Sequence, residues 1–152
     1  MDDIHIFLVH AIQLEFEAAR RYEDLRASML TAGNTEAAAF FAQMAEYSRL
    51  HLKDAMRRGG FRDLPRVEPH EWQWPEGVSP EQAAWAGVDG FIDIAGALQL
   101  ALDGEERSHL FYAAVAATTI DPEVRRMAHE FAQEEAEHVA ELERLISRQA
   151  AA

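Results

Sequence analysis

The sequence contains no cysteine among its 152 residues. This absence excludes disulfides, zinc–thiolate sites, iron–sulfur clusters and a rubredoxin-type iron centre, because each of them needs thiolate sulfur. Any metal ion that the chain binds must therefore be held by carboxylates and imidazoles.

Basic residues are also scarce, since 14 Lys and Arg face 27 Asp and Glu and give a formal net charge of −13. A surface of this sign repels nucleic acids and anionic membranes, so we expect neither as a partner and regard cations as the better ligands. No run approaches 18 uncharged apolar residues, and no basic leader precedes the first apolar segment. We therefore expect a cytoplasmic protein.

The sequence shows no strand alternation and no Asn-Gly hairpin signal. Apolar residues instead recur at helical spacing in four long segments, which are separated by glycines, an Asp-Pro pair and N-capping residues. We expect an all-α fold and a single domain spanning residues 1–152. The predicted helices cover about residues 3–32, 35–58, 92–118 and 122–148.

Residues 60–91 break the helical pattern and are expected to form an ordered crossover. Three prolines and a glycine between residues 61 and 79 prevent a long helix, while Trp72 and Trp74 give the segment side chains to bury. The N-capping Ser79, followed by proline, predicts a short helix from about residue 80. Gly87 and Gly90 are expected to interrupt it.

Three glutamates lie on the apolar faces of the predicted helices. The residues three, four and seven positions from Glu15, Glu105 and Glu135 are mostly apolar, whereas Glu17 shares its face with polar residues and is expected to point outward. An ionised carboxylate in an apolar interior costs several kcal/mol unless a cation or hydrogen bonds compensate it. No Lys or Arg falls on these inward faces, so histidine or a metal ion must provide the compensation.

Two histidines accompany these carboxylates. His138 follows Glu135 by three residues, and this Glu-x-x-His spacing lets one bundle helix present two ligands to a buried metal ion. His51 is also expected to face inward from its helix, beside Met44 and Ser48. The other histidines that are expected at the surface or in loops are His5, His10, His70 and His129.

The two halves of the chain match in an internal repeat. Glu15 and Glu105 are each followed seven residues later by a tyrosine, and aligning His51 with His138 places Met44 on Phe131 and Ala45 on Ala132. Two helical hairpins related by a pseudo-twofold axis would produce this pattern. The axis would pass through the expected metal site.

The segments LEFEAARRY, MAEYSRLH, GEERSHLFY and EEAEH resemble the ferritin-like superfamily, and within it the short rubrerythrin-like proteins. The resemblance covers roughly Ile6 to Ile146, apart from residues 61–91. It implies a ferritin-like four-helix bundle with a long crossover between the second and third helices.

The resemblance also implies a function. Members of this family hold two irons between carboxylates and histidines and use them in ferroxidase, peroxide-reducing or oxygen-handling chemistry. Carried over by position, the metal ligands are Glu15, His51, Glu105, Glu135 and His138. We expect iron, one or two ions, with manganese or zinc as alternatives. The implied activity is that of a non-haem iron oxidoreductase that uses O2 or peroxide and an external electron donor.

One position departs from the family pattern, because Ser48 stands where a second bridging glutamate is expected, three residues before His51. Glu46 could replace it only through a π-bulge, since five residues place it about 140° away from His51 on a regular helix. His109, one turn after Glu105, could be an extra ligand or could orient one. A centre with one weakly held ion and a mononuclear site are further alternatives.

Several side chains receive supporting or competing interpretations. Tyr22 and Tyr112 are expected to hydrogen-bond ligand carboxylates, and Ser48 could hold a metal-bound water. Apolar residues on two faces of the second helix, Phe40 and Phe41 with alanines 37–39, favour a homodimer. A functional alternative is a degenerate bundle whose partial metal site serves assembly or iron binding.

Overall fold

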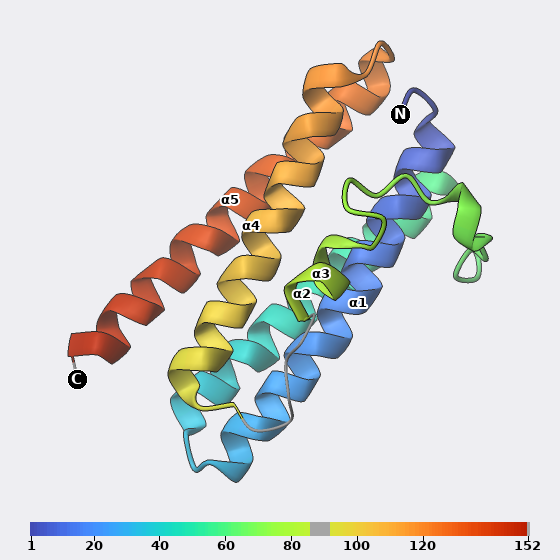
Figure 1. Cartoon of the computed structure of the whole chain (residues 1–152). Helices are drawn as coiled ribbons and strands as arrows, with labels where there is room; N and C mark the ends of the chain where they lie inside the picture. The colour runs from blue at the N-terminus through green and yellow to red at the C-terminus, as the bar shows by residue number, and fades with distance from the viewer. Residues whose placement is uncertain (86–91, 152) are drawn as a thin grey trace.

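The computed structural model describes residues 1–85 and 92–151. It contains two long helical hairpins that pack against each other as an all-α bundle (Figure 1). Helices α1 (Ile4–Thr31) and α2 (Thr35–Gly59) form the first hairpin, and α4 (Ile94–Thr118) and α5 (Pro122–Ala151) form the second. No strand occurs in the part of the chain that is described.

Local sequence signals explain where these helices begin and end. The carboxylate of Asp3 accepts a hydrogen bond from the backbone N–H of Ile6 at 3.0 Å, and the side chains of Asn34 and Asp93 cap their helices in the same way. Gly60 ends α2 with a φ of 71°, a left-handed conformation that glycine adopts without a steric penalty. The observed bounds therefore lie close to the expected ones.

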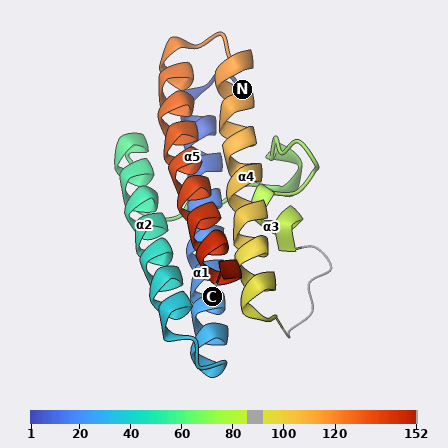
Figure 2. The ribbon, with the colours of Figure 1, turned by 90° about the vertical axis from the view of Figure 1, so that its left-hand side faces the viewer.

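The crossover between the hairpins is ordered where it is described. It contains the short 3-10 helix η1 (Pro69–Glu71) and the short helix α3 (Pro80–Trp85). The expected interruption at Gly87 and Gly90 lies outside the described residues. Figure 2 shows α3 beside α4, and α3 also contacts α1, so this helix spans the junction between the two hairpins.

His10 fixes the first part of the crossover to α1. Its Nδ1 donates a hydrogen bond to the Ile6 carbonyl at 2.8 Å, and its Nε2 accepts one from the backbone N–H of Gln73 at 2.9 Å. The ring is therefore a neutral tautomer. Trp72 and Trp74 pack edge-on against it, with ring centroids 5.0 and 4.6 Å away. The expectation of a surface or loop position was wrong for His10, which is 1% exposed, whereas His5, His70 and His129 are exposed.

The core consists of two apolar clusters. One is built around Phe41, Leu98 and Leu142, and the other around Phe7, Phe111 and Phe131. Between them lies a layer that contains buried polar side chains from all four long helices. The layer holds Glu15, Ser48, Glu105, Ser108 and Glu135.

The second helix is covered more fully than the sequence suggested. Phe41 is 0% exposed, Ala37 and Ala38 are also buried within the chain, and Phe40 is half-buried. The homodimer remains a prediction, and fewer apolar residues of this helix are left to support it. None of the described helices combines the length and the apolarity needed to cross a membrane.

Candidate metal centre

The centre of the polar layer is a small cavity that the two hairpins enclose together. It is lined by carboxylates and small polar side chains, with Leu14 and Ala18 as its apolar wall. The polar residues around it are Glu15, Ser48, Glu81, Glu105, Ser108, Glu135 and His138.

The α4/α5 hairpin contributes the tightest group of potential ligands. Glu105, Glu135 and His138 offer ligand atoms that all lie within 4.8 Å of one another, so this group could hold a metal ion. The Nδ1 of His138 lies 3.5 Å from an oxygen of each glutamate. This distance is long for a hydrogen bond but close to the separation of about 3.0 to 3.4 Å that two ligands of one ion adopt.

Burial and proximity strongly perturb the ionisation of this group. Burial raises the pKa of Glu135 well above its ordinary range, and the neighbouring Glu105 carboxylate raises it further. Burial acts in the same direction on Glu105, but the proximity of the Glu135 carboxyl and of the His138 ring outweighs it and lowers the pKa of Glu105. For His138, burial opposes the charge, yet the two carboxylates raise its pKa to about 11. The raised pKa values favour the protonated forms of Glu135 and His138, and these protons compensate the buried Glu105 carboxylate.

A tyrosine from the other hairpin orients this group. The Tyr22 hydroxyl donates a hydrogen bond to Glu105 Oε1. This contact is the carboxylate-orienting role expected for Tyr22. Its repeat counterpart Tyr112 is fully buried, but its hydroxyl has no hydrogen-bond partner among the described residues.

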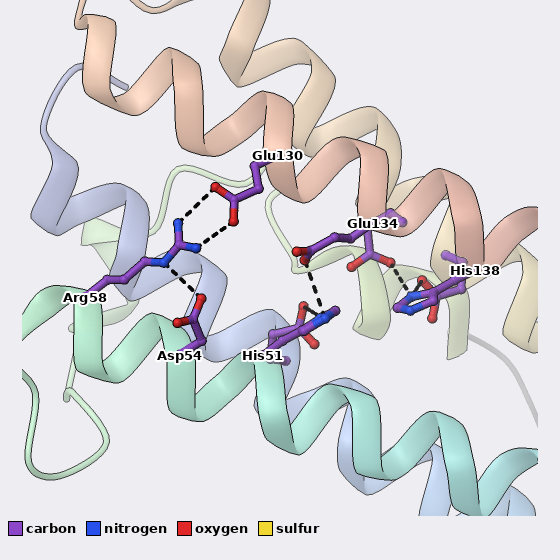
Figure 3. A network of polar contacts seen from close by, with 9 residues as sticks. His51, Asp54, Arg58, Glu130, Glu134 and His138 are labelled. Carbon is purple, nitrogen blue, oxygen red and sulfur yellow. Dashed lines mark hydrogen bonds and ion pairs between the residues drawn. The ribbon is translucent and has the colours of Figure 1, made fainter.

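The α1/α2 hairpin presents a looser arrangement, shown in Figure 3. His51 Nδ1 lies 3.6 Å from Glu15 Oε1, and His51 Nε2 lies 3.5 Å from Glu134 Oε2. The first distance exceeds a hydrogen bond, so Nδ1 is buried without a partner in the described part of the chain. Ser48, at the position that matches Glu135, is 4% exposed and adds no carboxylate.

Beside His51 and Glu134, a group of ion pairs lies at the edge of the polar layer (Figure 3). Arg58 of α2 binds Glu130 of α5 at 3.1 Å and Asp54 of its own helix at 2.9 Å. These contacts join the two hairpins beside the polar layer. They occupy the arginine at the rim, so it does not neutralise the inward carboxylates.

Comparison with known proteins adds a solved relative. No protein-family model matches the chain, and no curated protein matches it. A crystal structure of the uncharacterized conserved protein COG1633 from Magnetospirillum magnetotacticum is 36% identical to the chain. The match covers 93% of this chain and 92% of that one, with a TM-score of 0.76. The chain belongs to the COG1633 family.

Glu46 and His109 were the two possible substitutes for the missing carboxylate at position 48. Neither of them lines the cavity of the polar layer. The Glu46 side chain is 58% exposed and pairs with Arg49 at 3.2 Å. Helix α2 is a regular α-helix throughout, without the π-bulge that would turn Glu46 inward. The Nδ1 of His109 donates to the Ala132 carbonyl at 2.8 Å, so this ring links α4 to α5.

A residue that sequence reasoning missed lies in the cavity instead. Glu81, on the crossover helix α3, is 5% exposed and lines the cavity with the expected ligands. Burial raises its pKa well above the ordinary range, and the carboxylates of Glu105, Glu17 and Glu15 add to the effect. An acidic residue in the first turn of a helix normally faces solvent, so this position gave no reason to expect Glu81 to be buried. Gly104, inside a helix, was the available signal for a close approach.

Glu17 was also misplaced by the sequence pattern. It was expected to point outward, but it is 9% exposed because the crossover covers it. Its carboxylate accepts hydrogen bonds from the Ser79 hydroxyl, from Gln82 Nε2 at 3.1 Å and from Gln13 Nε2 at 2.7 Å. Glu17 therefore anchors α3 to α1 and is satisfied without a cation.

Proposed function

We propose that the chain is a ferritin-like metal-binding protein of the rubrerythrin-like type, with oxidoreductase chemistry on O2, peroxide or Fe(II). The observation that carries the proposal is the group formed by the buried Glu105 and Glu135 and the half-buried His138, whose potential ligand atoms all lie within 4.8 Å of one another. A carboxylate and imidazole set of this kind suits iron, manganese or zinc. The resemblance to ferritin-like proteins favours iron.

The residues of the second hairpin fit the same interpretation. The buried Nδ1 of His51 lacks a hydrogen-bond partner in the described part of the chain and faces Glu15. A buried nitrogen of this kind is costly unless something binds it. A metal ion would satisfy this nitrogen and the carboxylate together. We therefore assign Glu15, His51, Glu105, Glu135 and His138 as the ligand set.

Other side chains position the ligands. The Tyr22 hydroxyl fixes the orientation of Glu105 across the hairpin interface. The ring of His109 connects α4 to the Ala132 carbonyl of α5 and so sets the relative register of Glu105 and Glu135. Such outer contacts are worth roughly 10- to 100-fold in metal affinity in known sites.

Bound iron would supply the redox change, and the protein would supply ligand geometry, a dry pocket and restricted access. The apolar clusters on both sides of the layer exclude bulk water from the carboxylates. The chain has no cysteine for a rubredoxin-type centre, so the proposed electron donor lies outside these 152 residues.

Metal analysis tests the proposal. Metal-free protein is incubated anaerobically with Fe(II), desalted and analysed for iron by mass spectrometry, and peroxide is then added while the absorption spectrum is recorded. We expect bound iron and a peroxide-dependent spectral change. A folded protein that retains no Fe(II), and no Mn(II) or Zn(II) after the same loading with those ions, would contradict the proposal.

Ser48 favours a second candidate function. A buried serine at the position of the second bridging carboxylate would suit a bundle that binds iron weakly and serves as an assembly or iron-binding partner. In that case iron would bind without a spectral response to peroxide. The same experiment therefore separates the two functions.

A further inference from the structure

We propose that Glu81, carried by the crossover helix α3, is the fourth carboxylate ligand of the metal centre and takes the place of the glutamate that position 48 lacks. The inference rests on the proposed metal-binding function and extends it to a residue outside the four long helices. It predicts a centre that holds two ions.

The position of Glu81 is the first support. Its side chain is 5% exposed and lines the same cavity as Glu15, Ser48 and Glu105. Among residues 1–85 and 92–151, burial and the carboxylates of Glu105, Glu17 and Glu15 act on the Glu81 carboxyl without a hydrogen bond to offset them, although buried carboxylates normally have such partners. Arg21 is the nearby cation, and its guanidinium stacks on Trp85 at 4.8 Å. A metal ion would compensate the Glu81 carboxylate.

A glycine makes room for this side chain. A Cβ atom added at Gly104 would lie 3.1 Å from Glu81 Oε1, which is closer than ordinary van der Waals contact. In the internal repeat the residue that matches Gly104 is Leu14, directly before Glu15, and it forms part of the apolar wall of the cavity. The repeat is thus broken at the position where α3 brings its carboxylate against α4.

The crossover holds Glu81 in place through contacts on both sides of it. Ser79 and Gln82 donate hydrogen bonds to Glu17 of α1, and α3 packs along α4. The side chain in between is directed toward the junction of the hairpins. Two small residues, Ser48 of α2 and Ser108 of α4, line the same cavity as the Glu81 carboxylate.

The test is a metal count on the full chain. Metal-free wild type and Glu81→Gln are loaded anaerobically with excess Fe(II), desalted and analysed for iron per chain, and the affinity of each ion is measured by calorimetry. We expect two ions in the wild type and one in Glu81→Gln, with the second affinity lowered at least 100-fold. Glu106→Gln is the matched control, because Glu106 is exposed on α4 beside Glu105, and it should keep two ions.

The outcomes separate this inference from the proposed function. A wild type that binds no metal ion overturns both. A wild type that binds one ion, or a Glu81→Gln protein that still binds two, overturns the role of Glu81 and leaves the metal-binding function in place.

Two further variants cover the case in which Glu81→Gln does not fold. Gly104→Ala should weaken the second ion by displacing the Glu81 carboxylate, and an unchanged affinity would count against the proposal. In the exchange variant Glu81→Ala with Ser48→Glu, the carboxylate moves to the repeat position, and two ions should be recovered. A folded exchange variant that stays at one ion would overturn the claim that Glu81 replaces a carboxylate at position 48.

Discussion

The two hairpins are related by the internal repeat, but they differ in how well they are equipped to bind a cation. The α4/α5 hairpin carries Glu105, Glu135 and His138 within 4.8 Å of one another. The α1/α2 hairpin has Glu15 and His51 separated by 3.6 Å and a serine in place of the second glutamate. The matching positions of the two halves thus differ, because one half brings three potential ligand side chains together and the other offers two at a longer distance.

Removing one histidine from each hairpin should give the largest difference between them. We expect His138→Ala to weaken the binding of the first Fe(II) on the order of 100-fold or more, because it deletes a direct ligand of the tight group. His51→Ala should change that first affinity less than about 10-fold. Anaerobic calorimetry measures both. Equal losses would show that the halves are equivalent.

Replacing the buried acid by a hydrocarbon should distinguish the two matching positions by their effect on stability. In the metal-free state Glu135→Leu should lower the free energy of unfolding by about 1–3 kcal/mol, because it removes the carboxyl that helps to stabilise the buried Glu105 carboxylate and the charge on His138. Ser48→Ala, at the matching position, should change it by less than about 1 kcal/mol. Urea unfolding monitored by circular dichroism provides the values. A stabilised Glu135→Leu would indicate that the acid is poorly compensated in the metal-free protein.

The two repeat tyrosines form a matched pair. Tyr22→Phe removes the donor to Glu105 and should cost roughly 1–2 kcal/mol of stability, together with a loss of about 10-fold in metal affinity. Tyr112→Phe removes a hydroxyl that has no partner among the described residues and should be neutral or slightly stabilising. Thermal unfolding and metal titration of both variants test this difference. The reverse order would contradict the assigned contacts.

The smallest expected effect concerns His10, whose repeat position in α4 is occupied by Leu100. Burial lowers the pKa of His10 below its ordinary value of 6.5, so the unfolded chain binds more protons at mildly acidic pH. Stability is therefore retained above pH 6.5 and lost as the pH falls below it, by up to about 1.4 kcal/mol per pH unit. Unfolding at pH 7.5 and 5.5 measures the loss, which His10→Leu should reduce. An identical pH dependence in that variant would exclude this origin.

Much of the fold follows from local signals in the sequence. The capping residues Asp3, Asn34 and Asp93 and the breaker Gly60 fix helix ends through contacts within a few residues, which a sequence shows directly. The inward positions of Glu15, Glu105 and Glu135 follow from helical periodicity alone, and all three are buried. These features depend on neighbours along one helix.

The features that the sequence did not show depend on the crossover. Glu17 and His10 lie on helix faces whose periodicity suggests exposure, but the crossover covers both of them. Glu81 was missed because its burial depends on where α3 docks against α4, and no pattern within six residues of helix reports that position. Gly104, inside a helix, indicated that another part of the chain approaches α4 closely, but the sequence did not show that this part is Glu81.

The hydrogen bonds from Ser79 and Gln82 to Glu17 have a consequence for how such a bundle can diversify. They fix the crossover to α1, so a change in the length or sequence of this segment would alter which side chains reach the polar layer. Ala84 and Trp85 of α3 also pack in one apolar cluster and Trp74 packs against the other, so the same change would extend into the core.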